Sequence, residues 1–196
     1  MNDTEPPTAG GKVLWHTMLS LDGFIAGPDD DMGWVFGVDG GPGQTMDDVV
    51  NSTGALLVGR RTQDVEDRLQ PGFYGGAFRG PFFVLRHDPP AQPPVVKGVT
   101  GQFLDMGIEE AVTVAKKAAD GANVVILGAN VAGQCLKAGL LDEIIVHIAP
   151  VLVGEGVRLF ESAGGAPIRL EAISSHEEGE TTVLRYAVRQ TPEERR

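Results

Sequence analysis

Residues 124–160, VVILGANVAGQCLKAGLLDEIIVHIAPVLVGEGVRLF, decide the fold of this chain. Four apolar residues at 124–127 predict a buried strand, and Gly128 ends it where the backbone turns sharply. A short helix is expected to follow, through about Ala138, and the apolar run at 143–149 predicts the next strand. Strand, glycine turn, helix and strand in this order are typical of an α/β protein with a parallel sheet.

The start of the predicted helix is a place where an anion can bind. Asn130 is the expected N-cap, and Gly139 suits the position just beyond the last turn. The free N–H groups and the dipole at a helix start favour a phosphate or pyrophosphate. The segment lacks a full dinucleotide-binding fingerprint, so the alternative is a turn that only connects a strand and a helix, without a ligand.

A second glycine turn carries cationic side chains. The apolar strand at 55–58 leads into Gly59, Arg60, Arg61 and Thr62, at the start of a run compatible with a helix. Arginine supplies fixed donors for phosphate oxygens, which a bare helix terminus lacks. The alternative is that both arginines are solvated surface charge.

A third strand also ends in basic residues. The apolar run at 82–85 is followed by Arg86 and His87 before a Pro-rich turn. Because the carboxyl ends of parallel strands meet along one rim, we expect the three strand ends to share one anionic ligand.

Four stretches together resemble the dihydrofolate-reductase-like superfamily: LSLDGFIAGPDDDMGW at 19–34, LLVGRRT at 56–62, FFVLRHDPP at 82–90, and the 124–160 segment. Within this superfamily the chain is closer to the C-terminal reductase domain of the bifunctional riboflavin-biosynthesis deaminase/reductase than to a true dihydrofolate reductase. The resemblance implies a three-layer α/β/α fold with a mixed, mostly parallel central sheet. It also implies an NADPH-dependent reductase that is often dimeric.

The resemblance assigns cofactor positions. It implies that the phosphates of NADPH lie against two glycine loops and the turn after the third strand, while backbone near the N-terminus flanks the nicotinamide. Ala129 stands where the family usually has a second glycine. The implied cofactor-binding residues are Met18, Ile25, Ala26, Gly59, Arg60, Arg61, Thr62, Arg86, His87, Gly128, Ala129, Asn130 and Val131.

The proton donor is the part of the site that the sequence leaves open. True dihydrofolate reductases carry a carboxylate in the helix before the Gly59 strand, and the register places that position near Gly43, which has no side chain. Asp22 matches an acid common to the riboflavin branch, although an Asp-Gly turn needs no catalytic role. Asp48 lies on the expected helix at 45–52 but about one turn away. Asp22 and Asp48 are therefore the catalytic candidates.

Composition indicates a globular enzyme and argues against several other classes. The chain has 196 residues, 42% of them apolar, and a formal net charge of −11, so nucleic acid and anionic membranes are not expected partners. Cys135, the single cysteine, is expected to be a buried core thiol. The histidines are scattered and no CxxC is present, so no metal site is predicted, and His147 is expected to be structural.

The chain is expected to form a single reductase-like domain at 12–189, with disordered tails at 1–11 and 190–196. It shows no secretory signal and no run of about 18 apolar residues, so a cytoplasmic location is expected. The strand at 143–149 is apolar on both faces, and few later residues remain to cover it. We therefore expect a homodimer that pairs through the C-terminal region.

The sequence thus predicts an NADPH-dependent oxidoreductase that transfers hydride to a small heterocycle or carbonyl compound, of the 5-amino-6-(5-phosphoribosylamino)uracil reductase type. Two alternatives stay open. One is a dihydrofolate or pteridine reductase, and the other is a nucleotide-binding dimer without turnover.

Overall fold

A computed structural model describes residues 10–38, 43–69, 72–161 and 167–189. Its main sheet has eight strands in the order β11-β12-β9-β1-β8-β3-β4-β7. In chain order these strands are β1 (Val13–Ser20), β3 (Thr53–Gly59), β4 (Phe82–Leu85), β7 (Gln102–Leu104), β8 (Asn123–Leu127), β9 (Glu143–Ala149), β11 (Leu170–Glu178) and β12 (Thr181–Val188). The pairs from β9 to β7 are parallel, whereas β12 runs antiparallel to both β9 and β11. The predicted mixed, mostly parallel sheet is confirmed.

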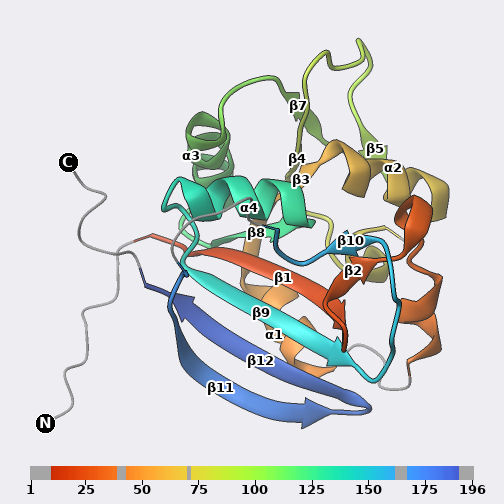
Figure 1. Ribbon diagram of the computed structural model, residues 1–196. Coiled ribbons are helices and arrows are strands. Elements are labelled where there is room, and N and C mark those ends of the chain that lie inside the picture. The colour runs from red at the N-terminus through yellow and green to blue at the C-terminus, as the bar shows by residue number, and fades with distance from the viewer. Residues whose placement is uncertain (1–9, 39–42, 70–71, 162–166, 190–196) are drawn as a thin grey trace, which may run out of the picture.

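Helices cover the sheet on both faces (Figure 1). The α-helices are α1 (Gln44–Ser52), α2 (Arg60–Leu69), α3 (Ile108–Ala119) and α4 (Ala129–Lys137), and the short 3-10 helices are η1 (Pro28–Asp30), η2 (Gly33–Gly37) and η3 (Phe73–Gly76). Two small ribbons complete the fold, β2 (Phe24–Ala26) with β10 (Val157–Arg158), and β5 (Val95–Val96) with β6 (Val99–Thr100).

Each face of the sheet has its own apolar core. Val112 of α3 and Val131 of α4 pack on one face with Trp15 of β1. Val49 of α1 and Phe73 of η3 belong to the core on the other face. The predicted three-layer α/β/α architecture follows from this alternation, because the central parallel strands β1, β3, β8 and β9 have buried residues in both cores.

The connections of the central strands reverse direction between β1 and β8. From β1 the chain crosses over β8 through α1 to reach β3, whereas from β8 it crosses over β1 through α4 to reach β9. α1 and α4 lie on opposite faces. Such a topological switch point opens a crevice at the carboxyl ends of the two strands, which is where open α/β sheets bind ligands.

Several predicted boundaries agree with the structure and a few do not. The strand expected at 143–149 has the predicted ends. Asn130 is not the N-cap of α4: Gly128 is, because its positive φ of 90° turns the chain and the helix starts at Ala129. The prediction of a buried core thiol at Cys135 is confirmed, and burial raises its pKa to about 12.

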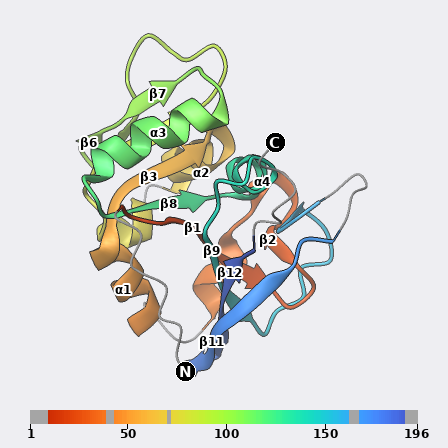
Figure 2. The ribbon, with the colours of Figure 1, turned by 90° about the vertical axis from the view of Figure 1, so that its left-hand side faces the viewer.

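The sheet ends in an exposed hairpin. Figure 2 shows β11 and β12 at the edge opposite β7. Ile173 of β11 is 48% exposed and Leu170 is 43% exposed, and no residue of β11 is buried. By contrast, β9 is covered on both faces within one chain. The expectation that β9 itself needs a second subunit was therefore wrong, and the uncovered strand is β11.

The described part of the chain begins and ends close to the predicted domain limits. The expected tails at 1–11 and 190–196 lie largely outside the described residues. Gly11 is an exception: a Cβ placed on it would lie 1.7 Å from the Ala122 carbonyl oxygen. The folded unit therefore starts before Lys12.

Candidate functional site

The two predicted glycine loops touch each other at the rim of the sheet. A Cβ added to Gly128 would lie 2.5 Å from Thr62 Oγ1, and one added to Gly59 would lie 3.3 Å from Val131 Cγ2. The Thr62 hydroxyl also approaches the Leu127 carbonyl oxygen at 3.5 Å. The start of α2 and the start of α4 thus form one cradle, with room for backbone only at Gly128.

The arginines of the first loop are exposed and lie near acids. Arg60 is 3.6 Å from the Asp64 carboxylate and Arg61 is 3.9 Å from that of Asp30, with more than half of each arginine side chain exposed. Exposed ion pairs of this kind contribute little to stability. Both guanidinium groups are therefore available to an incoming anion.

Arg86 and His87 stand at the end of β4, beside the first loop. The Arg86 guanidinium lies over the Phe103 ring, 5.4 Å from its centroid. Its Nε is buried without a hydrogen-bond partner among the described residues. His87 is almost fully exposed, and its Nδ1 lies 3.0 Å from Asp105 Oδ1. A buried donor without a partner favours a ligand acceptor at Arg86.

The remaining cofactor positions lie on or beside the same rim. Ala129 and Asn130 form the first turn of α4, where Asn130 Oδ1 accepts a hydrogen bond from Gln134. Met18 is near the end of β1, opposite His147 in the β1–β9 register. Ile25 and Ala26 are buried in β2. The structure thus brings the predicted residues to the ends of β1, β8, β3 and β4, around the switch point.

Asp22 is held by hydrogen bonds. Oδ1 accepts from the Ser20 hydroxyl at 2.7 Å and from the Val153 N–H at 3.0 Å, and Oδ2 accepts from the Gly154 N–H at 2.7 Å. These bonds, led by that from Ser20, lower the pKa of Asp22 to about 2. The carboxylate therefore stays ionised at neutral pH and fixes the loop after β9 beside β2. Its role as a catalytic acid stays a prediction, which these contacts do not favour.

Asp48 lies away from the rim. It lines a groove of about 470 Å3 between α1 and the C-terminal strands, together with Thr45 and His176. Its Oδ1 accepts a hydrogen bond from Gln44 Nε2 at 2.7 Å. No hydrogen bond or ion pair among the described residues links Asp48 to the Met18 end of β1.

A buried polar cluster on the α1 face of the sheet was missed from the sequence. His16 Nε2 lies 2.9 Å from His147 Nε2, and His16 Nδ1 lies 2.9 Å from the Tyr74 hydroxyl. His16 is 4% exposed and His147 is 8% exposed. The only sign of this cluster in the sequence is a histidine in each of two apolar strands. Only the tertiary pairing of β1 with β9, and the position of η3, show that they meet.

Glu178 supplies a carboxylate at the start of α1. A Cβ on Gly43 would lie 2.1 Å from Glu178 Oε2. Oε1 accepts hydrogen bonds from the Thr45 N–H at 2.8 Å and from the Thr45 hydroxyl at 2.7 Å, whereas Oε2 is buried without a partner in the described part of the chain. Burial opposes ionisation, but hydrogen bonds from Thr45 and His176 and the nearby His147 together lower the pKa of Glu178.

The carboxylate beside position 43 thus comes from another strand, β11. The resemblance placed a missing carboxylate near Gly43, and the structure places that of Glu178 beside it. No local pattern in the sequence indicates this, because residues 43 and 178 meet only through the hairpin β11–β12.

The histidine pair makes the stability depend on pH. Burial, reinforced for His16 by the neighbouring His147, lowers the pKa of both rings. The unfolded chain therefore binds more protons below about pH 6.5, and the free energy of unfolding is expected to fall by up to about 1.4 kcal/mol per pH unit for each histidine. Urea unfolding at pH 7 and pH 5.5 measures this loss. The His16→Leu/His147→Leu double variant should lose less between the two pH values, and an equal loss would contradict the assignment.

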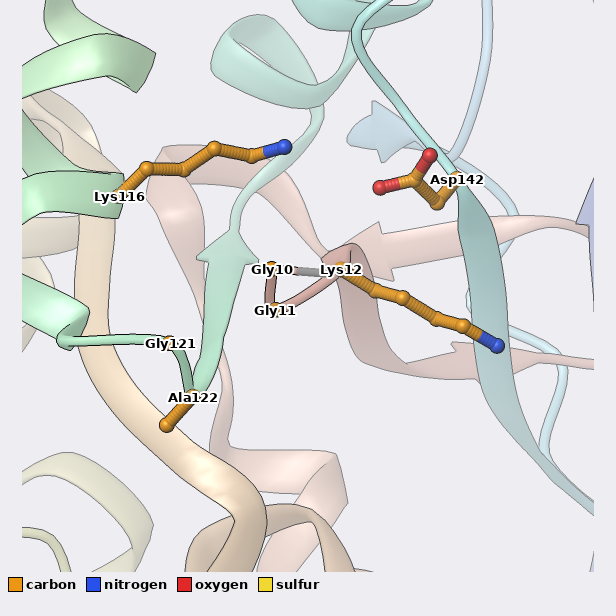
Figure 3. A pocket seen from close by; sticks show the side chains of 7 residues that line it. All are labelled: Gly10, Gly11, Lys12, Lys116, Gly121, Ala122 and Asp142. Carbon is orange, nitrogen blue, oxygen red and sulfur yellow. The ribbon is translucent and has the colours of Figure 1, made fainter. Parts of the chain in front are cut away.

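A second pocket lies at the opposite end of the strands (Figure 3). Its volume is about 300 Å3, and it lies at the amino-terminal ends of β1 and β8. Lys116 and Asp142 reach toward the space between them, whereas Lys12 extends away and pairs with Glu143. Asp142 Oδ2 already accepts the Val13 N–H at 2.7 Å. This pocket is separate from the rim.

Within the described ranges, no group of three or more His, Cys, Asp or Glu side chains is placed to hold a metal ion. None of the described helices is long and apolar enough to cross a membrane.

One family model matches nearly the whole chain. The family described as RibD C-terminal domain matches residues 11–184. The uncharacterized protein YwjB of Bacillus subtilis (strain 168) is 26% identical over 182 residues, which are 89% of this chain and 97% of that protein.

Solved structures share the fold. A putative riboflavin biosynthesis protein from Shewanella sp. PV-4 superposes with a TM-score of 0.77 at 20% identity, covering 91% of this chain and 99% of the other. A diaminohydroxyphosphoribosylaminopyrimidine deaminase/5-amino-6-(5-phosphoribosylamino)uracil reductase from Thermotoga maritima gives a TM-score of 0.66 at 15% identity, covering 91% of this chain and 57% of the other.

Proposed function

The chain belongs to the RibD C-terminal domain family, and from this premise we propose that it is an NADPH-dependent reductase of the 5-amino-6-(5-phosphoribosylamino)uracil reductase type. The observation that carries the proposal is the cradle at the rim. There two glycine loops meet and leave no room for a side chain at Gly128. A phosphate ester bound at two helix starts is the ligand that such a cradle suits.

The residues at the rim fit a dinucleotide with a 2′-phosphate. Gly128, Ala129 and the N–H groups of the first turn of α4 would hold the pyrophosphate, with Thr62 opposite them. Arg60, Arg86 and His87 would meet the 2′-phosphate, because Arg86 Nε is a buried donor without a partner among the described residues. Met18, Ile25 and Ala26 would flank the nicotinamide. NADPH, when bound, supplies the two electrons and the hydrogen of a reduction.

The substrate would lie on the α1 side of the crevice. The Thermotoga maritima protein is named a reductase of a phosphoribosylaminouracil, and the ring-opened form of such a compound carries a C=N bond. On this side, His147 and Glu178 would supply a donor and an acceptor to a nitrogen heterocycle. Asp22 would keep the loop at 153–154 in place beside β2.

Two mixing experiments test this function. A change of nicotinamide fluorescence on mixing the chain with NADPH reports binding, and NADPH oxidation after addition of 5-amino-6-(5-phosphoribosylamino)uracil reports turnover. We expect both signals. If NADPH binds but neither this compound nor dihydrofolate causes its oxidation, the chain is instead a non-catalytic nucleotide-binding protein. Oxidation with dihydrofolate alone would support the folate alternative.

The protein is further proposed to form a homodimer through β11. This edge strand is exposed from Leu170 to Glu177 and carries Leu170 and Ile173 on its surface. A long exposed edge with apolar side chains associates readily with a second strand, and in a two-fold dimer the same strand serves both subunits.

Light scattering at low micromolar concentration is expected to give about twice the single-chain mass of 20.7 kDa. Ile173→Lys should shift the mass toward one chain, because it places a charge in the apolar contact. Val95→Lys, at an equally exposed valine in β5, is the matched control and should leave the mass unchanged. A wild-type mass near 20.7 kDa would overturn the dimer.

A further inference from the structure

The buried cluster of Tyr74, His16 and His147 has a defined direction of hydrogen bonding. The only partner of the Tyr74 hydroxyl among the described residues is His16 Nδ1, at 2.9 Å. If the hydroxyl accepted from His16 instead, its own O–H would have no acceptor among the described residues, at a cost of about 1–3 kcal/mol. Tyr74 therefore donates its proton to His16 Nδ1.

The direction passes from one ring to the next. A neutral imidazole carries one N–H, so His16, with Nδ1 accepting, carries its proton on Nε2. This N–H donates to His147 Nε2 at 2.9 Å. His147 then carries its own proton on Nδ1. Burial lowers the pKa of both rings and keeps them neutral, which this chain of single donors requires.

The remaining N–H lies next to the crevice. His147 is opposite Met18 in the β1–β9 register, near the carboxyl end of β1. It stays 8% exposed, and its Nδ1 makes no hydrogen bond to a described residue. The charged or titratable groups near this ring are His16, His176 and Glu178. The relay thus ends in a free donor on the substrate side.

Tyr74 is held in place at a conformational cost. Its φ of 56° lies in the left-handed region, which costs a non-glycine residue on the order of 1–3 kcal/mol. The neighbouring Phe73 anchors the segment, because it is 2% exposed and packs against Phe82 with ring centroids 5.1 Å apart. The packing of Phe73 offsets this cost and keeps the tyrosine hydroxyl against His16.

We propose that His147 is the catalytic proton donor of the reductase, and that Tyr74 and His16 are positioning residues that keep its proton on Nδ1. The inference rests on the proposed function. His147 gives its Nδ1 proton to the nitrogen of the substrate C=N bond while the carbon of that bond takes hydride from NADPH, which leaves an amine and NADP+. Water at the crevice then returns a proton to His147 Nδ1 and leaves hydroxide, while Tyr74 and His16 keep their protons throughout.

Turnover of the full-length chain with NADPH and 5-amino-6-(5-phosphoribosylamino)uracil tests the assignment. His147→Phe should lower kcat at least about 100-fold, the usual contribution of a positioned acid, with the NADPH dissociation constant unchanged. Tyr74→Phe should lower kcat about tenfold, since His16 can then adopt either tautomer. Tyr186→Phe makes the same chemical change on β12 and should leave kcat unchanged. Full activity of a folded His147→Phe variant would overturn the proposal and leave the proposed function standing.

The tautomer of His147 provides a readout that does not depend on turnover. Nitrogen-15 NMR of the wild-type chain is expected to show His147 protonated on Nδ1 and His16 on Nε2. In Tyr74→Phe both rings should populate two tautomers. Protonation of His147 on Nε2 in the wild type would overturn the proposal. Absence of NADPH oxidation by the wild-type chain would contradict the proposed function and the proton-donor role with it, whereas the NMR result would still decide the tautomers of His16 and His147.

Discussion

Replacing Gly128 by valine is expected to lower the affinity for NADPH at least about 100-fold. The residue has a φ of 90°, and a Cβ there would lie 2.5 Å from Thr62 Oγ1. A branched side chain would therefore push α2 and α4 apart and fill the space where phosphate oxygens meet backbone N–H groups. Loss of two charge-assisted hydrogen bonds, each about 1.5–3 kcal/mol, accounts for a change of this size. Calorimetric titration with NADPH measures it.

The control for this variant must carry the same backbone strain without the crowding. Gly121 serves, because its φ is 85° and nothing lies within 4 Å of its added Cβ. Gly121→Val should lose only the thermal stability that the backbone strain costs, and it should keep its NADPH affinity. If Gly128→Val unfolds, or binds NADPH as well as Gly121→Val does, Gly128 serves only the fold.

Removing the side chain of Arg86 is expected to cost 10- to 100-fold in NADPH affinity while NADH affinity stays the same. The buried Nε of Arg86 has no partner in the described ranges, and Phe103 holds the guanidinium in place. A 2′-phosphate would accept hydrogen bonds from this guanidinium, and each such bond contributes about 1.5–3 kcal/mol to the binding free energy. The wild type should accordingly bind NADPH at least about tenfold more tightly than NADH.

Arg86→Ala is compared with Arg79→Ala, which removes an exposed arginine that lies before β4. Arg79→Ala should leave both affinities unchanged. Equal affinity of the wild type for NADPH and NADH, or an equal loss for both cofactors in Arg86→Ala, would contradict the assignment of the 2′-phosphate site.

The rim could be predicted because its signals are local. Apolar runs followed at once by Gly59, Arg86 and Gly128 identify strand ends, and parallel strands bring their ends together. The order β8-β3-β4 confirms that these three strands are neighbours. The prediction of Asn130 as N-cap was wrong because two residues suited to a helix start lie close together. The positive-φ turn at Gly128 starts the helix at Ala129, so Asn130 falls inside its first turn.

The substrate side could not be predicted, because its groups meet only in the folded chain. His16 and His147 are 131 residues apart in the sequence, and each alone looks like an isolated histidine in an apolar strand. Glu178 approaches Gly43 because the C-terminal hairpin adds β12 beside β9. The pairing of strands, rather than any motif, creates the polar cluster.

Transfer of label from the cofactor tests the central claim most directly. In a single turnover of the wild-type chain with 5-amino-6-(5-phosphoribosylamino)uracil and NADPH deuterated at C4 of the nicotinamide, mass spectrometry of the product is expected to show one deuterium per molecule. The label should appear with one stereoisomer of the cofactor only, because a fixed crevice presents one face of the ring. A product without deuterium from either stereoisomer, or no product at all, would contradict the account.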